Sequence, residues 1–190
     1  MGKRNGLDRL YGETGKLALR TKKNGGNKMT DREIRNEYWE KALREIRCRV
    51  EEAFGGMKYH LGRNAFDGKT RKGLQLSCVA DIRPAKISVG MYFKTRNQET
   101  NKALFEYMMR RRDEILSMLP FNDVTIGQAS ENGHQLGGDR KQYNITVSMK
   151  KDVLDRERWV ECCNFHCTVA RVLYEYVFVE KKQAIESLIS

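Results

Sequence analysis

The chain has 190 residues, of which 39% are hydrophobic and 32% charged. This is enough for one domain with a core, and too apolar for a wholly disordered chain. No stretch approaches the ~20 apolar residues of a membrane helix, and the N-terminus lacks the apolar segment of a signal peptide. Five cysteines, an odd number, argue against a disulfide-stapled secreted protein and favour reduced thiols in a cytoplasmic one.

The N-terminal segment carries much of the positive charge. Lys and Arg number 36 against 25 Asp and Glu, which gives a net charge of +11. Residues 1–28 hold eight basic and two acidic side chains, so they contribute +6 of this excess. The segment has six glycines and no sustained apolar period. We expect a flexible basic arm, with Lys22 and Lys23 contacting nucleic acid. A merely solubilising tail is the alternative.

Apolar spacing predicts the elements that follow the arm. Thr30 and Glu33 form a capping box, so a helix is expected from there to about residue 54. Residues 57–61 fit a short strand and residues 62–72 a basic loop. Alternating residues predict strands over 74–82 and 86–94, joined by a turn at Arg83-Pro84-Ala85 into an antiparallel hairpin.

The second half of the chain repeats this pattern. A helix is expected over residues 98–119, ended by Pro120. Strands are expected over 124–128 and 143–149, with a loop at 130–138 between them. Asp152 or Asp155 is expected to cap a long last helix. We expect Trp39, Leu104, Phe105 and Trp159 to be largely buried.

The order of these elements defines the predicted fold. Helix, two strands, helix, two strands and helix are typical of an α+β domain over residues 30–190. We expect an antiparallel sheet of about four strands, in two hairpin-like pairs, packed against three helices.

Several blocks of the sequence carry a resemblance to a known family. They occupy residues 35–40, 73–77, 86–93, 101–105, 111–115, 155–159 and 174–178. The most specific is Asn101-Lys102-Ala103-Leu104-Phe105. Over roughly residues 34–180 the chain resembles the domain-of-unknown-function family numbered 4268. The resemblance implies a prokaryotic restriction or phage-defence context, in which such modules accompany nuclease-like or DNA-processing domains, and it supplies no catalytic residues.

A cluster of thiols and an imidazole late in the chain has the residue types of a zinc site. Cys162, Cys163, His166 and Cys167 lie within six positions, but on a helix at most two of them face one ion. Two further ligands, such as Cys48 or Cys78, would be required. The same residues fall on the apolar stripe of the last helix, so core packing is the favoured interpretation and no metal is expected.

A metal-dependent nuclease is the catalytic alternative. Such enzymes use an acid on one strand and an acid-x-Lys triplet on another to hold magnesium. Asp123 and the triplet ending Asp139 and Lys141 could supply this set, although an Asp beside glycine is also an ordinary turn residue. Magnesium is implied under this alternative alone; otherwise no cofactor is expected.

Nucleic-acid binding has broader support, because basic residues gather near the predicted strand ends. If these loops meet at one edge of the sheet, they form a phosphate-binding surface, with Tyr59 or Tyr92 available to stack a base. Besides the arm, the expected contacts are Arg63, Lys69, Arg71, Lys72, Lys94 and Arg96. Arg83, Lys86, Arg140, Lys141, Lys150 and Lys151 lie in the same loops.

The hypothesis that follows is a non-catalytic module that binds DNA, RNA or a protein partner. A separately encoded nuclease or defence subunit is the partner class that the family resemblance implies. No membrane association is expected, and a homodimer stays open.

Overall fold

The computed structural model describes residues 28–50, 64–71, 73–127 and 143–190; for residues 43, 45–50 and 64–71 it describes the backbone alone. The strands are β1 (Asn64–Arg71), β2 (Leu74–Asp81), β3 (Lys86–Phe93), β4 (Val124–Gly127) and β5 (Tyr143–Met149). The helices are α1 (Asp31–Val50), α2 (Gln98–Met109), α3 (Arg112–Ser117), α4 (Trp159–Glu175) and α5 (Lys182–Ile189).

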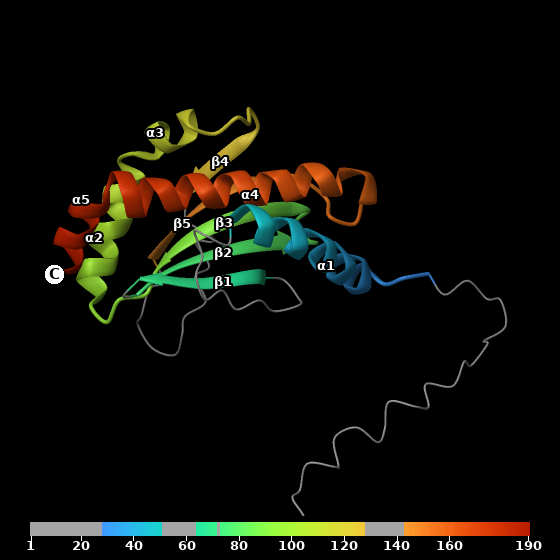
Figure 1. Cartoon of the computed structure of the whole chain (residues 1–190), viewed down its shortest axis with the longest axis horizontal. Helices are drawn as coiled ribbons and strands as arrows, with labels where there is room; N and C mark the ends of the chain where they lie inside the picture. Colours follow the sequence, from blue (N-terminus) through green and yellow to red (C-terminus); the bar gives the residue numbers. More distant parts are fainter. Residues whose placement is uncertain (1–27, 51–63, 72, 128–142) are drawn as a thin grey trace, which may run out of the picture.

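The strands form one antiparallel sheet in the order β1-β2-β3-β5-β4. The helices lie over one face of it, with α4 running across the sheet (Figure 1). The predicted α+β class is therefore confirmed. The sheet has five strands in the described residues, one more than the four expected.

Alternating apolar residues place β2, β3 and β5 in the centre of the sheet. One face carries Leu76, Met91 and Ile145, which lie opposite one another in register and are 0–1% exposed. Trp39 of α1 and Leu104 of α2 are buried against this face at 0% exposure, and Trp159 of α4 at 5%. These three predictions are confirmed, whereas Phe105 is only partly buried.

The basic loop predicted over residues 62–72 is wrong, because β1 occupies most of it. Asn, Asp, Gly and Lys are poor strand formers, and the segment shows no apolar alternation. It pairs as an edge strand because β2 offers a free row of backbone donors and acceptors, and backbone pairing needs no particular side chain. The strand predicted over residues 57–61 lies outside the described residues.

The helix predicted over residues 98–119 is two helices, so that prediction is also wrong. Arg111 lies over the Tyr107 ring at 3.8 Å, and its Nη1 donates to the Tyr107 carbonyl at 3.2 Å. Its backbone N–H turns to the Met108 carbonyl instead. The side chain thus takes the acceptor that a continuous helix would use, and α3 starts at the next residue.

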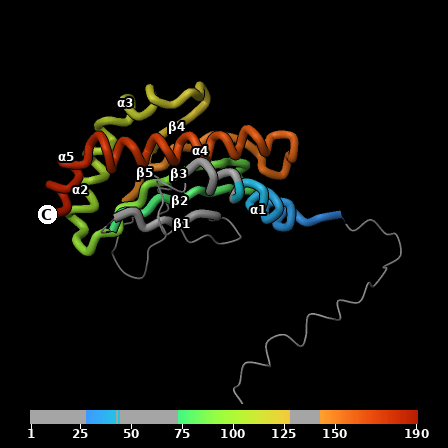
Figure 2. The backbone as a smooth tube through the Cα atoms, in the orientation of Figure 1, coloured from blue at the N-terminus to red at the C-terminus, as the bar shows by residue number. Residues whose placement is uncertain are grey.

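The C-terminal segment is built from more pieces than the single long helix expected. Asp155 caps a short 3-10 helix, η2 (Arg156–Arg158), by accepting from the Glu157 N–H, and Asp152 accepts from the Leu154 N–H in the preceding turn. The prediction that one of them caps the last helix is wrong, because α4 begins after Arg158 with no side-chain cap. A π-helical turn, η3 (Tyr176–Glu180), separates α4 from α5. The backbone trace shows α5 beside α2, where the chain ends (Figure 2).

Candidate nucleic-acid interface

The sheet brings several of the predicted basic residues to one of its ends. Arg71 lies opposite Leu74, and Leu74 lies opposite Phe93. The ends of β1 and β3 therefore lie at the same end of the sheet, on either side of the start of β2. Lys69 pairs with Gln75 one step further in. Lys94 and Arg96 follow β3 directly and are exposed. We call Lys69, Arg71, Lys94 and Arg96 the strand-end cluster.

Lys94 is held against the polar face of the sheet. Its Nζ donates to Gln75 Oε1 and lies 5.4 Å from the centre of the Tyr92 ring. The half-buried Tyr92 ring folds back over Gly90, where an added Cβ would approach Tyr92 Cε2 to 2.8 Å. Proteins that bind single-stranded nucleic acid combine cations for the phosphates with aromatic rings on which bases stack.

Two residues fix the corner that carries Lys94 and Arg96. Asn101 is 2% exposed, and its Oδ1 accepts from the Thr95 N–H at 2.9 Å and from the Thr95 hydroxyl at 2.7 Å. Its amide donates back to the Thr95 carbonyl at 3.2 Å. Gly73 has φ +91°, and a Cβ there would lie 2.8 Å from the Thr95 backbone. The corner is therefore rigidly placed before any partner binds.

The basic residues of the β2–β3 turn lie at the opposite end of the sheet. The condition that all the basic loops meet at one edge is therefore not met, because a hairpin places its turn and its free ends at opposite ends. Lys86 and Lys94 are eight positions apart along one strand, which is roughly 26 Å. Arg83 and Lys86 thus belong to a separate surface.

This second surface is an open cleft between the start of α1 and the β2–β3 turn. We call it the turn cleft; its lining residues are Asp31, Arg32, Arg35, Asp81, Ile82, Arg83, Pro84 and Lys86. Sequence reasoning missed Arg32 and Arg35. Their spacing of three places both on one side of the first helical turns, but no local pattern shows that the hairpin turn lies opposite.

The zinc candidates are core residues. Cys162, Cys163 and Cys167 are buried free thiols, and burial raises the pKa of Cys162 to about 12, so it stays protonated and is a poor metal ligand. In the described residues, no three His, Cys, Asp or Glu side chains are grouped to hold a metal ion.

His166 is likewise occupied within the fold. Its Nε2 lies 3.1 Å from the Val79 carbonyl and its Nδ1 lies 2.8 Å from Tyr38 Oη. Because a carbonyl only accepts, Nε2 carries the proton and Nδ1 accepts from the tyrosine. Complete burial lowers the pKa of His166 to about 4, although hydrogen bonds to the Val79 and Ser88 backbones oppose the shift. Neither ring nitrogen is free to bind a metal.

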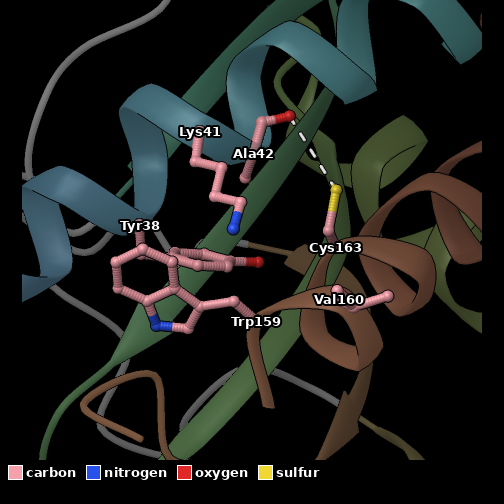
Figure 3. A pocket seen from close by; sticks show the side chains of 6 residues that line it. All are labelled: Tyr38, Lys41, Ala42, Trp159, Val160 and Cys163. Carbon is pink, nitrogen blue, oxygen red and sulfur yellow. Dashed lines mark hydrogen bonds between the residues drawn. The ribbon is translucent and has the colours of Figure 1, made fainter. Parts of the chain in front are cut away.

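A hollow lies between α1 and α4 (Figure 3), and Tyr38, whose hydroxyl contacts this imidazole, is one of its lining residues. Trp159 and Lys41 line it, with Lys41 Nζ 5.6 Å from the centre of the indole ring. Cys163 closes it from the α4 side through a 3.9 Å contact with the Ala42 carbonyl. Its volume of about 10 Å³ is near the minimum for one water molecule. The hollow is a packing seam and not a ligand site.

Of the nuclease candidates, Asp123 is exposed just before β4. Asp139 and Lys141 lie outside the described residues, so the nuclease arrangement stays a prediction. Four of the expected nucleic-acid contacts also lie outside the described residues, namely Lys22, Lys23, Arg63 and Lys72. Lys69 and Arg71 are placed by their backbones alone.

Comparison with known proteins identifies the family. The family described as "Domain of unknown function (DUF4268)" matches residues 34–180. No curated protein and no solved structure matches the chain. None of the helices in the described part of the chain combines the length and apolar character needed to cross a bilayer. The match extends from the first turns of α1 to the end of η3, and the chain therefore belongs to the DUF4268 family.

Proposed function

We propose that the protein is a non-catalytic nucleic-acid-binding module that contacts the phosphate backbone through the strand-end cluster and the basic arm. The observation that supports this most is the position of Lys94. It lies at the end of the sheet where β1 and β3 end, beside Tyr92 and exposed to solvent. Cations carried by the ends of two strands at the same end of the sheet suit a polyanion.

The family resemblance extends the proposal to a setting. A module of a prokaryotic or phage defence or restriction-type system would deliver a separately encoded nuclease to nucleic acid. Contacts of Lys and Arg to phosphates would give the module affinity for nucleic acid of any sequence, because phosphates carry no base information.

Salt dependence of binding tests this proposal. A labelled DNA duplex of roughly 20 base pairs and a single strand of equal length are titrated with the full chain, at salt concentrations from ~50 to ~200 mM. The double variant Lys94→Gln/Arg96→Gln is compared with Lys102→Gln/Arg110→Gln, which removes two exposed cations from α2 and its end. We expect the slope of log affinity against log salt to become shallower by about 2 in the first variant only.

Two results would contradict the proposal. No binding at ~50 mM salt, where phosphate contacts are strongest, would leave a protein partner as the function. Cleavage of plasmid DNA with magnesium, lost on Asp139→Ala, would instead support the metal-dependent nuclease with Asp123, Asp139 and Lys141.

A further inference from the structure

The turn cleft is large enough to hold a ligand and is predominantly basic. Its volume is about 690 Å³, within the ~300–1,000 Å³ of typical ligand pockets. Four of its lining residues are cationic and two are acidic, so its charge is +2. Asp81 lies opposite Lys86 in the hairpin register. Arg32, Arg35 and Arg83 therefore provide the excess.

These arginines are not committed to partners inside the fold. Within the described residues, none of Arg32, Arg35 and Arg83 makes an ion pair or a side-chain hydrogen bond. The Nε atom of Arg35 is shielded from solvent and has no hydrogen-bond partner. A buried donor without an acceptor destabilises the protein. An anion in the cleft would supply the missing acceptor.

The N-terminus of α1 does not itself provide the anion site. Thr30 and Glu33 form the predicted capping box: the Glu33 N–H donates to the Thr30 hydroxyl at 3.3 Å, and the Thr30 N–H donates to Glu33 Oε2 at 2.8 Å. The Glu33 carboxylate also places negative charge at this end. Attraction for an anion thus comes from the guanidinium groups that face the cleft from two elements.

We propose that the turn cleft binds a phosphate group, held between Arg32 and Arg35 of α1 and Arg83 of the β2–β3 turn. Guanidinium forks match the oxygens of phosphate in geometry as well as in charge. The group belongs either to a nucleic acid or to a free phosphate compound. The site lies at the end of the sheet opposite the strand-end cluster, so it does not depend on the proposed function of that cluster.

Calorimetric titration of the full chain with inorganic pyrophosphate tests the site directly, with sodium chloride of equal ionic strength as the blank. The variants are Arg35→Gln and the double variant Arg32→Gln/Arg83→Gln, whose two side chains are exposed and so leave folding unaffected. The control is Lys102→Gln/Arg110→Gln. We expect binding to the wild type and to the control, and at least a ~10-fold loss of affinity in both cleft variants, since each variant removes charge-assisted hydrogen bonds to the anion.

Absence of pyrophosphate binding by the wild type, or equal affinity in the cleft variants, would overturn the site. Competition separates the two sources of phosphate. If a DNA duplex displaces pyrophosphate, and Lys94→Gln/Arg96→Gln leaves pyrophosphate affinity unchanged, the cleft holds backbone phosphate. If pyrophosphate binds and no DNA binds at all, the cleft takes a free phosphate compound and the function proposed for the strand-end cluster fails alone.

Discussion

The seam between α1 and α4 and the two basic ends of the sheet differ in how their polar groups are used. In the seam, both nitrogens of His166 have partners, and Trp159 Nε1 donates to the Val153 carbonyl at 2.8 Å. Trp39 Nε1 is the exception in the seam, because it has no hydrogen-bond partner. In the turn cleft, Arg35 Nε has no hydrogen-bond partner either. The paired groups of the seam hold the fold together, whereas the arginines of the turn cleft are available to a partner. Lys94, at the other basic end, is exposed but contacts Gln75 and Tyr92.

The largest expected effect is a loss of stability when an apolar side chain between α1 and α4 is removed. Trp159→Ala should lower the free energy of unfolding by ~3–5 kcal/mol, because it removes a large buried side chain. Val160→Ala is the matched control, since Val160 is 75% exposed, and it should change stability by less than ~0.5 kcal/mol. Urea denaturation measures both. Equal losses in the two variants would contradict the packing described for α4.

The second expected effect is a dependence of stability on pH. His166 is neutral in the fold with a pKa of about 4, against an ordinary value of 6.5. Between these values the unfolded chain binds the proton and the folded chain does not, so stability falls as pH decreases from 6.5 towards 4. The difference corresponds to about 3 kcal/mol at most. Denaturation of wild type and His166→Gln across this range checks it: the variant should lose that part of the slope, and parallel curves would refute the assignment.

A smaller effect is expected at the corner that positions Lys94. Asn101→Ala removes the acceptor of the Thr95 N–H and should cost ~1–3 kcal/mol. It should also weaken polyanion binding, because the corner loses its fixed geometry. Thr100→Ala, one position away, is the control. Thermal unfolding and DNA titration of both variants measure the two consequences, and unaltered DNA affinity in a less stable Asn101→Ala would show that the corner need not be rigid.

The smallest expected effect on stability belongs to the strand-end cluster. Lys94→Gln/Arg96→Gln should change the free energy of unfolding by less than ~0.5 kcal/mol while reducing DNA affinity, since exposed cations contribute little to folding. Urea denaturation beside the DNA titration separates the two roles. If the free energy of unfolding fell by several kcal/mol, these cations would stabilise the fold, as the paired groups of the seam do.

The sequence predicts an element correctly when a local pattern of residues specifies that element. The alternation in β2, β3 and β5 and the helical period of α1 and α4 reflect burial of one face, so these elements are predicted correctly. The edge strand β1 is not, because its pairing depends on the exposed backbone of β2. The break at Arg111 depends on one side chain taking a helical carbonyl, which no period reveals.

The candidate sites show the same limit. Lys94 and Arg96 are predicted because they follow a recognisable strand directly. Arg32 and Arg35 are missed because their role depends on α1 starting beside the β2–β3 turn, a tertiary relation without a local pattern. For the same reason the sequence leaves open whether the basic loops share one edge: it shows which residues adjoin strands, but the register decides at which end of the sheet each one lies.

Hydrogen–deuterium exchange of the full chain, with and without a DNA duplex of roughly 20 base pairs at ~50 mM salt, tests the central claim most directly. Because it reports every segment in one sample, it compares the two kinds of region at once. The account predicts slower exchange at residues 94–97 when DNA is added, and unchanged exchange across α4. Slower exchange at residues 83–86 as well would show that the turn cleft holds DNA phosphate. Unchanged exchange at residues 94–97, or protection confined to α4, would contradict the account.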